Sequence, residues 1–102
     1  MNSAELPISF DPQELATFCR ERGIRKLSLF GSVLRDDFSP DSDLDVLVEF
    51  IPGQTPGLAF FGYGDELGKL IGRKVDLNTP GFLSKYFRND VLRDAVTIYE
   101  QA

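Results

Sequence analysis

The sequence predicts a single α+β domain in which short helices and strands are mixed along the chain. With 102 residues, the chain has room for one modest hydrophobic core and no second module. Its composition, 42% hydrophobic and 26% charged, is that of an ordinary globular protein. A helix-start signal near the N-terminus is followed by short apolar runs bounded by turn residues. We therefore expect one domain over residues 1–102.

The first helix is expected to begin after Asp11, which suits the N-cap, with Pro12 at the first helical position. Gly23 is expected to end it. Three apolar residues recur at helical spacing and are expected to face the core: Leu15, Phe18 and Cys19. We interpret the single cysteine as a small buried side chain, since a free cysteine in such a stripe packs like an apolar residue.

The later elements follow from the same patterns. In order, we expect a strand at 24–30, a short helix at 33–37, a strand at 44–51, a helix at 58–71, a strand at 74–78, short helices at 82–88 and 90–95, and a last strand or extended tail at 96–99. The helix at 58–71 contains Gly62, Gly64 and Gly68, each of which costs about 1 kcal/mol relative to alanine in a helix interior. Its first half is therefore expected to be poorly ordered or dependent on a ligand.

Composition also excludes several kinds of function. The formal charge of −5, with lysine and arginine scattered, argues against a surface that coats nucleic acid. The absence of histidine removes histidine-based acid/base chemistry, metal ligation and catalytic triads. One cysteine cannot form an internal disulfide, and neither a signal pattern nor a membrane-length apolar run is present. We expect a cytoplasmic protein whose chemistry rests on carboxylates, hydroxyls and cations.

Carboxylates carry the strongest chemical signal. Asp43 and Asp45 flank Leu44 at the start of an apolar strand, so their side chains should point to the same side. Two like charges aimed at one place disfavour each other's ionisation unless a cation lies between them. A third acid, Asp76, lies in the strand at 74–78 and can converge with them if the two strands are neighbours. Three carboxylates with substrate phosphates suit one or two Mg²⁺ ions.

A Gly-Ser turn precedes these acids. Gly31 and Ser32 should lie where a strand ends and a helix begins, so backbone N–H groups and the hydroxyl can hold a phosphate. Arg35, one helical turn further, can reach the same phosphate. Taken singly, each feature has an ordinary structural explanation: a plain turn, a solvated strand edge, a capped strand end. Their order along one short chain is what indicates a site.

These residues resemble a known family. The run from Gly31, Ser32 and Arg35 through Ser42, Asp43 and Asp45, with Asp76 in a later apolar strand, is similar to the signature of the DNA polymerase beta-like nucleotidyltransferase superfamily. The small size and the segments GRKVDLNT and RNDVLRDAVTIYE look most like the minimal nucleotidyltransferases. Those are small bacterial and archaeal proteins, commonly antitoxins paired with HEPN-domain ribonuclease toxins.

The resemblance implies a small mixed β-sheet with helices packed on it, and transfer of AMP from ATP to an acceptor hydroxyl. It implies that Asp43 and Asp45 ligate Mg²⁺, and that Asp76 completes one metal site and helps to deprotonate the acceptor. It also implies triphosphate contacts from four residues: Gly31, Ser32, Arg35 and Ser42. Some family members modify a tyrosine of the partner toxin, which is the expected acceptor here. One departure is Asp36, which stands where many members have glycine, and it is followed by a second acid, Asp37.

Three functions are consistent with this pattern. The first is an adenylyltransferase antitoxin that modifies its toxin and forms a hetero-oligomer with it. The second is an antitoxin that neutralises the toxin by binding alone, with a vestigial or nucleotide-sensing site and aromatic anchors at Phe60, Phe61 and Tyr63. The third is a small-molecule nucleotidyltransferase, which ranks lower because such enzymes generally use a second domain to hold the acceptor.

Overall fold

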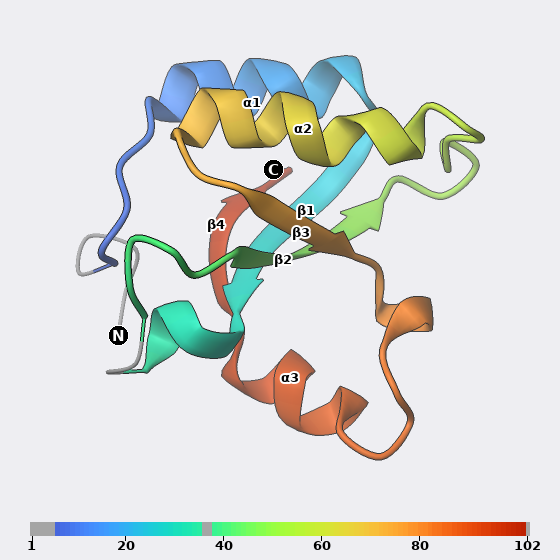
Figure 1. Cartoon of the computed structure of the whole chain (residues 1–102). Coiled ribbons are helices and arrows are strands. Elements are labelled where there is room, and N and C mark those ends of the chain that lie inside the picture. The colour runs from blue at the N-terminus through green and yellow to red at the C-terminus, as the bar shows by residue number, and fades with distance from the viewer. Residues whose placement is uncertain (1–5, 36–37, 102) are drawn as a thin grey trace.

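The computed structural model describes residues 6–35 and 38–101, and it contains one four-stranded sheet with helices on both faces (Figure 1). The elements are α1 (Pro12–Glu21), β1 (Ile24–Phe30), the 3-10 helix η2 (Gly31–Leu34), β2 (Leu44–Phe50), α2 (Phe60–Ile71), β3 (Val75–Asn78), the 3-10 helix η3 (Pro80–Phe82), α3 (Arg88–Asp94) and β4 (Val96–Glu100). The lead-in residues 1–5 and the acids Asp36 and Asp37 lie outside the described residues.

The sheet is mixed, as the family resemblance implied. Its strand order is β3-β2-β1-β4. The β1 strand pairs antiparallel with both β2 and β4, whereas β2 and β3 run parallel. A parallel pair needs a crossover connection, and α2 supplies it. The α+β class is therefore confirmed, and β4 is the last strand, the first of the two alternatives expected for residues 96–99.

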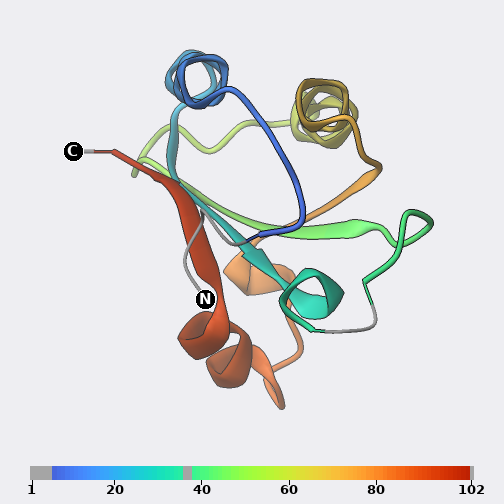
Figure 2. The same ribbon diagram turned by 90° about the vertical axis from the view of Figure 1, so that its left-hand side faces the viewer.

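The core lies between the sheet and the pair α1 and α2, which cover the same face (Figure 2). The cap of α1 is as predicted, because the Asp11 carboxylate accepts a hydrogen bond from the Gln13 backbone N–H at 2.8 Å. The side chains predicted to face inward from α1 are buried, and they meet fully buried side chains of the other elements. These core residues include Leu15, Phe18, Cys19, Leu27, Leu29, Val46, Val48 and Leu67.

The glycine-rich helix is one continuous element, which corrects the expectation of a poorly ordered first half. One of its glycines allows a close approach of the chain that leads into β3. A Cβ atom on Gly68 would lie 2.7 Å from the Arg73 carbonyl oxygen, whereas one on Gly64 would make ordinary contact, at 3.7 Å, with Val75 backbone and Leu77 side-chain atoms. Gly68 therefore serves the packing of α2 on this segment, which its intrinsic helix propensity does not reveal.

Two predicted short helices are wrong. Of the helix expected at 33–37, the described residues 33–35 instead form the end of η2, a single 3-10 turn at Gly31–Leu34, and an extended Arg35, while 36–37 lie outside the described residues. The helix expected at 82–88 is replaced by η3 and a turn, since Leu83 is extended and the Ser84 hydroxyl accepts from the Tyr86 backbone N–H at 3.3 Å. Such local side-chain bonds compete with helix formation. The helix expected at 90–95 is present as α3, two residues earlier at its start.

None of the helices within residues 6–35 and 38–101 has the length and apolar character needed to cross a bilayer.

Candidate active site

The three predicted acids lie on two neighbouring strands. Asp45 of β2 and Asp76 of β3 are direct partners in the parallel pair, so their side chains point to the same face. Asp43 lies just before β2, two residues from Asp45, and strand alternation directs it the same way. Leu44 and Val46, which flank Asp45, are fully buried in the core under α1 and α2. The acids therefore occupy the opposite, open face of the sheet.

The charges of these acids act on one another. Partial burial raises the pKa of the Asp45 carboxyl, the negative charges of Asp76 and Asp43 raise it further, and the nearby Arg35 guanidinium opposes the rise. Asp43 and Asp76 are themselves exposed to solvent. The carboxylates are thus close enough to repel, and Asp45 is the member that lies deepest.

The donor set suits an open Mg²⁺ site. Within residues 6–35 and 38–101, no three carboxylate, thiol or imidazole groups are gathered in a ready-made metal cage. Mg²⁺ does not require one, because it keeps several waters and takes one or two protein carboxylates together with substrate phosphates. The mutual repulsion at Asp45 is the physical observation that a bound cation would relieve. The residues therefore fit the ion that the sequence predicted.

Gly31 is the residue that brings the Gly-Ser turn against the acids. Phe30, just before it, is the partner of Asp45 in the antiparallel β1–β2 pair. Gly31 has φ +79°, and a Cβ atom there would lie 2.2 Å from the Asp45 carboxylate oxygen. Glycine suits this position, because a larger residue would strain the left-handed backbone and displace the Asp45 carboxylate. The turn and the acid thus form one unit.

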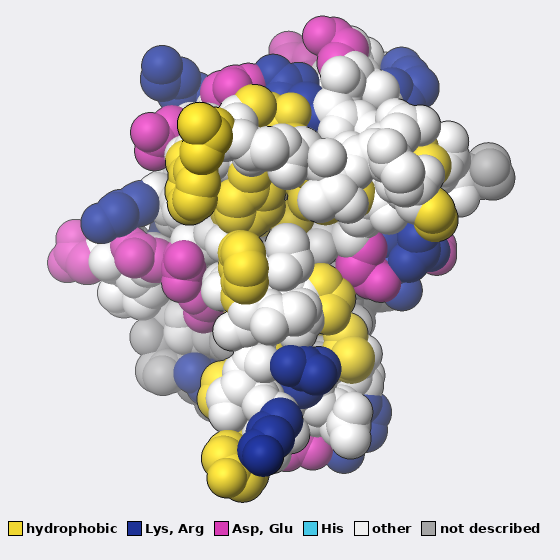
Figure 3. Space-filling view, turned by 90° about the vertical axis from the view of Figure 1, so that its right-hand side faces the viewer, with side chains coloured by type: hydrophobic (Ala, Val, Ile, Leu, Met, Phe, Trp, Pro, Cys, Tyr) yellow, Lys and Arg dark blue, Asp and Glu magenta, His cyan; other side chains and the backbone are white. Residues whose placement is uncertain are grey.

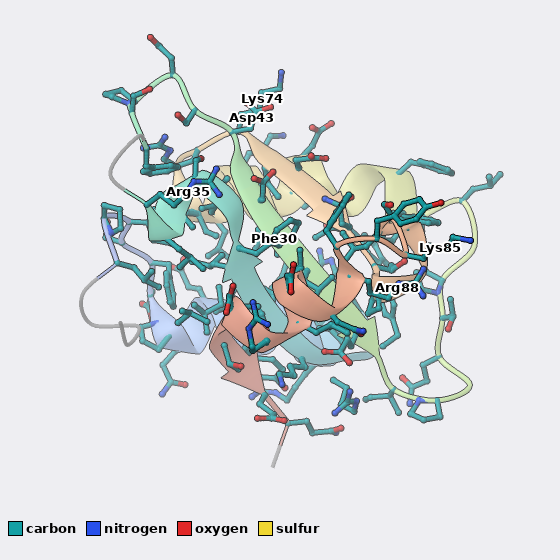
Figure 4. The ribbon with its side chains drawn as sticks, turned by 90° about the horizontal axis from the view of Figure 1, so that it is seen from below. Phe30, Arg35, Asp43, Lys74, Lys85 and Arg88 are labelled. Carbon is teal, nitrogen blue, oxygen red and sulfur yellow. The ribbon has the colours of Figure 1, made fainter. Side chains whose placement is uncertain are left out.

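Ser32 and Arg35 lie beyond that turn. Ser32 is half-buried within η2, and its carbonyl oxygen accepts from the Arg35 backbone N–H at 2.9 Å. Arg35 is exposed, and its charge reaches Asp45. Seen from below, Phe30 lies near the centre of the view, with Arg35 to one side, Lys85 and Arg88 to the other, and Asp43 above it beside Lys74 (Figure 4).

Ser42 is engaged within the loop before β2. Its hydroxyl accepts from the Ser39 backbone N–H and lies 3.1 Å from the Ser39 hydroxyl. Its predicted triphosphate contact therefore requires a hydroxyl that also holds the loop together.

Arg73 is a residue that sequence reasoning missed. Its guanidinium donates to the carbonyl oxygens of Ser39, at 2.6 Å, and Ser42, at 2.9 Å, and it stacks 4.2 Å from the centre of the Phe38 ring. It thereby ties the loop that leads into Asp43 to the start of β3. A basic residue before the Asp76 strand was visible in the sequence, but its partners lie more than 30 residues away.

A cleft adjoins the Gly-Ser turn. Its volume is about 910 Å³, and it lies between the end of β1 and α3, with Gly31, Arg35, Asp90, Asp94 and Val96 among its lining residues. That volume is in the range of small-molecule sites. Sequence analysis could not find it, because its two walls come from segments far apart in the chain.

The fold and the acid-bearing face together define a nucleotidyltransferase domain. Residues 12–98 match the family described as nucleotidyltransferase domain, and the chain belongs to that family. Among curated proteins, it is 38% identical over 82 residues to the protein adenylyltransferase MntA of Thermococcus cleftensis, covering 78% of this chain and 80% of the relative. It is also 35% identical over 77 residues, covering 74% of this chain and 76% of the relative, to a Methanocaldococcus jannaschii protein described as a protein adenylyltransferase. The predicted family and enzyme class are thus confirmed.

Solved structures agree on the fold. A minimal nucleotidyltransferase shares 34% identity and a TM-score of 0.67, covering 83% of this chain and 86% of that one. A toxin-antitoxin structure with AMP-PNP gives a TM-score of 0.68 at 17% identity, covering 89% and 74%. A Shewanella oneidensis complex of an MNT antitoxin with a tri-AMPylated HEPN toxin gives 0.61 at 17% identity, covering 88% and 70%. The two complexes support the fold alone, because their identity to this chain is low.

Proposed function

We propose that this nucleotidyltransferase transfers AMP from ATP to a tyrosine hydroxyl of a HEPN-domain toxin, and so acts as its antitoxin. The observation that carries the proposal is the joining of Asp43, Asp45 and Asp76 on one open face, with Gly31 packed against Asp45. The relatives named protein adenylyltransferases support the reaction, and the partner is proposed by analogy with the antitoxin of similar fold that is complexed with an AMPylated HEPN toxin.

Different residues of the chain would bind the metal ion and the triphosphate. Asp43 and Asp45 would hold Mg²⁺, with Asp76 completing one site, and the ion supplies charge neutralisation at the triphosphate when bound. Gly31, Ser32, Ser42 and Arg35 bind and orient the triphosphate, by backbone N–H groups, hydroxyls and a guanidinium.

The transfer forms one bond to the α-phosphorus, breaks another and removes one proton from the acceptor. The acceptor oxygen forms a bond to the α-phosphorus of ATP, and the bond between that phosphorus and the oxygen bridging to the β-phosphate breaks. Pyrophosphate leaves with the electron pair of the broken bond. Asp76 would help to take the acceptor's proton, and its solvent-exposed carboxylate beside Asp45 supports that role.

The test incubates the protein with labelled ATP, Mg²⁺ and the HEPN-domain product of the adjacent gene. We expect label on a tyrosine of that product with the wild-type protein, and none with Asp43→Asn plus Asp45→Asn. Asp65→Asn, at an exposed acid of α2, is the matched control and should label as the wild type does. Unlabelled product with the wild-type protein, or equal label with the double variant, would refute the proposal.

Neutralisation by binding alone is the second candidate. It is favoured by one observation, the large exposed apolar side chains beside α2 and η3, which include Phe61 and Phe82. A variant with all three acids changed to asparagine separates the candidates in cells. If that variant protects against the toxin as well as the wild type does, binding alone is the function.

A further inference from the structure

Large apolar side chains are exposed on two segments that flank the end of β3. Phe61 is 77% exposed and Tyr86 is 86% exposed, which is unusual for aromatic residues in a small domain. We call this surface the aromatic face and define it by Leu58, Phe61, Phe82, Tyr86 and Phe87. Figure 3 shows hydrophobic side chains gathered along this side of the molecule.

The aromatic face is linked through one half-buried ring. Phe60, in the first turn of α2, makes edge-to-face contacts with Phe61 at 6.0 Å and with Phe82 of η3 at 5.9 Å, measured between ring centres. The turn after η3 is held in place, because the Arg88 guanidinium donates to the Leu83 carbonyl oxygen at 2.9 Å. Phe61 and Phe82 are thus joined through Phe60, and the turn that carries Tyr86 and Phe87 is fixed to the fold beside them.

The charge of the aromatic face differs from that of the rest of the chain. Residues 50–64 contain no charged side chain, and residues 79–89 contain only Lys85 and Arg88. Both are cations in a protein whose formal charge is −5. A complementary surface would therefore combine apolar side chains with carboxylates.

The aromatic face is continuous with the candidate active site. β3 carries Asp76 and runs directly into η3, which carries Phe82. In the view of Figure 4, Lys85 and Arg88 lie on the other side of Phe30 from Arg35, and Asp43 lies above Phe30 beside Lys74. A protein bound on the aromatic face would thus reach the acids from their Asp76 side.

We propose that the aromatic face is the docking surface for the protein that presents the acceptor hydroxyl, and that the contacting surface of this partner is apolar with acidic side chains. The inference rests on the proposed function, since it places the acceptor protein of that same reaction. A second copy of this chain fits poorly, because the segments 50–64 and 79–89 that form its aromatic face offer no carboxylate side chain to pair with Lys85 and Arg88. Two cations are also too few for stable binding to a membrane or to nucleic acid.

The experiment measures binding of the HEPN-domain partner by calorimetry. Phe61→Ser plus Tyr86→Ser removes the two most exposed rings, and we expect binding at least about tenfold weaker. Lys85→Glu should weaken binding and reduce its dependence on salt. Leu92→Ser, at a 43% exposed position of α3, is the matched control and should bind as the wild type does. Thermal melting and ATP-analogue binding check that each variant is folded with its site intact.

Variants of the acids test the docking surface separately from the proposed reaction. Asp43→Asn plus Asp45→Asn should bind the partner normally while failing to label it. If the wild type binds but does not label, while the ring variant loses binding, the reaction is refuted and the docking surface stands. Wild-type affinity in the ring variant overturns the docking surface, whether or not label is transferred. Failure of the wild-type protein to bind the partner also overturns the docking surface. The same holds if the ring variant binds the partner normally and loses only self-association.

Discussion

Gly31 and Asp45 depend on each other through direct contact. The absence of a side chain at Gly31 leaves room for the Asp45 carboxylate, and the positive φ turns the chain toward Ser32. Four described glycines have positive φ, but in Gly31 alone of these four does a carboxylate fill the space of the missing side chain. This pair therefore joins the Gly-Ser turn to the three acids, which we propose bind phosphate and metal.

Gly31→Ala is expected to reduce AMP transfer at least about tenfold, because left-handed backbone strain of about 1–2 kcal/mol adds to displacement of the Asp45 carboxylate. The rate of label transfer at saturating ATP measures the effect. Gly53→Ala is the matched control, since Gly53 has φ +83° but open space around its Cα. Gly53→Ala should have the same backbone strain as Gly31→Ala and keep the wild-type rate of AMP transfer. Equal losses in both variants would contradict the role of the contact.

Cys19 is predicted to be unreactive in the folded protein. Burial raises the pKa of its thiol from about 9 to about 12, although Arg22 and Arg20 oppose the rise. Because the folded pKa exceeds the unfolded one, the stability that this thiol confers is complete below about pH 9 and is lost as pH rises toward 12.

Two measurements check this expectation. A thiol reagent at pH 8 should label the protein only after denaturation. Urea unfolding should show stability falling above pH 9 more steeply for the wild type than for Cys19→Ala, which cannot ionise. Rapid labelling of the native protein would show that the thiol is accessible.

The loop before β2 is held in place by a residue that lies outside the loop. Its residues 38–42 are fixed by the Arg73 guanidinium, which contacts two carbonyl oxygens and one aromatic ring. Because Asp43 directly follows this loop, we propose that Arg73 is a positioning residue for the acids of the candidate site.

Arg73→Ala is expected to raise the Mg²⁺ concentration needed for half-maximal AMP transfer, since a loosened loop no longer holds Asp43 beside Asp45. Arg73→Lys should restore the Mg²⁺ response in part, because lysine keeps the charge but loses the planar fork. The control is Arg25→Ala, which removes a 2.9 Å ion pair to Glu49 elsewhere on the sheet. An unchanged Mg²⁺ requirement in Arg73→Ala would refute the positioning role.

The α2 glycines provide a matched test of helix packing. Gly68→Ala should lower the free energy of unfolding by roughly 1–2 kcal/mol, because the clash with the Arg73 carbonyl exceeds the gain in helix propensity. Gly62→Ala should raise it by up to about 1 kcal/mol, since the nearest atom to its Cβ would be a Glu66 side-chain oxygen at 3.8 Å. Urea denaturation measures both values. Stabilisation by both substitutions would mean that α2 does not pack closely on β3.

For the molecule as a whole, repulsion among the three acids is expected to lower the melting temperature of the metal-free protein, and bound ligand is expected to raise it. Asp45→Asn should raise the melting temperature of the metal-free protein by a few degrees, because it removes repulsion from Asp43 and Asp76. Mg²⁺ with a non-hydrolysable ATP analogue should stabilise the wild type and not this variant. Calorimetric melting with and without the ligands gives both numbers. Equal ligand stabilisation of the two proteins would place the metal elsewhere.

Much of the molecule could be predicted from local patterns. The Asp11 cap, the stripe of Leu15, Phe18 and Cys19, and the three apolar strands all follow from rules that act within a few residues. The spacing of Asp43 and Asp45 was equally readable, because strand alternation alone sends both side chains the same way.

Errors arose where a residue's partner lies outside the local pattern, or where a local side-chain bond redirects the chain. Gly68 looked like a weak point of a helix, but it leaves room for the Arg73 carbonyl oxygen just before β3. The helix expected at 82–88 had suitable composition, but Ser84 and the extended Leu83 redirect the chain there. No local sequence pattern predicts the hydrogen bonds from Arg73 to the loop before β2, or the cleft between the end of β1 and α3.

The residue types of the candidate site and their order are properties of the chain, since carboxylates, glycine and arginine carry their chemistry wherever they lie. Their convergence is a property of the fold. Asp76 faces Asp45 only because α2 crosses over the sheet and sets β3 parallel to β2 in one particular register. Register is chosen by which side chains the whole core can bury, and a shift of one residue would turn Asp76 away from Asp45.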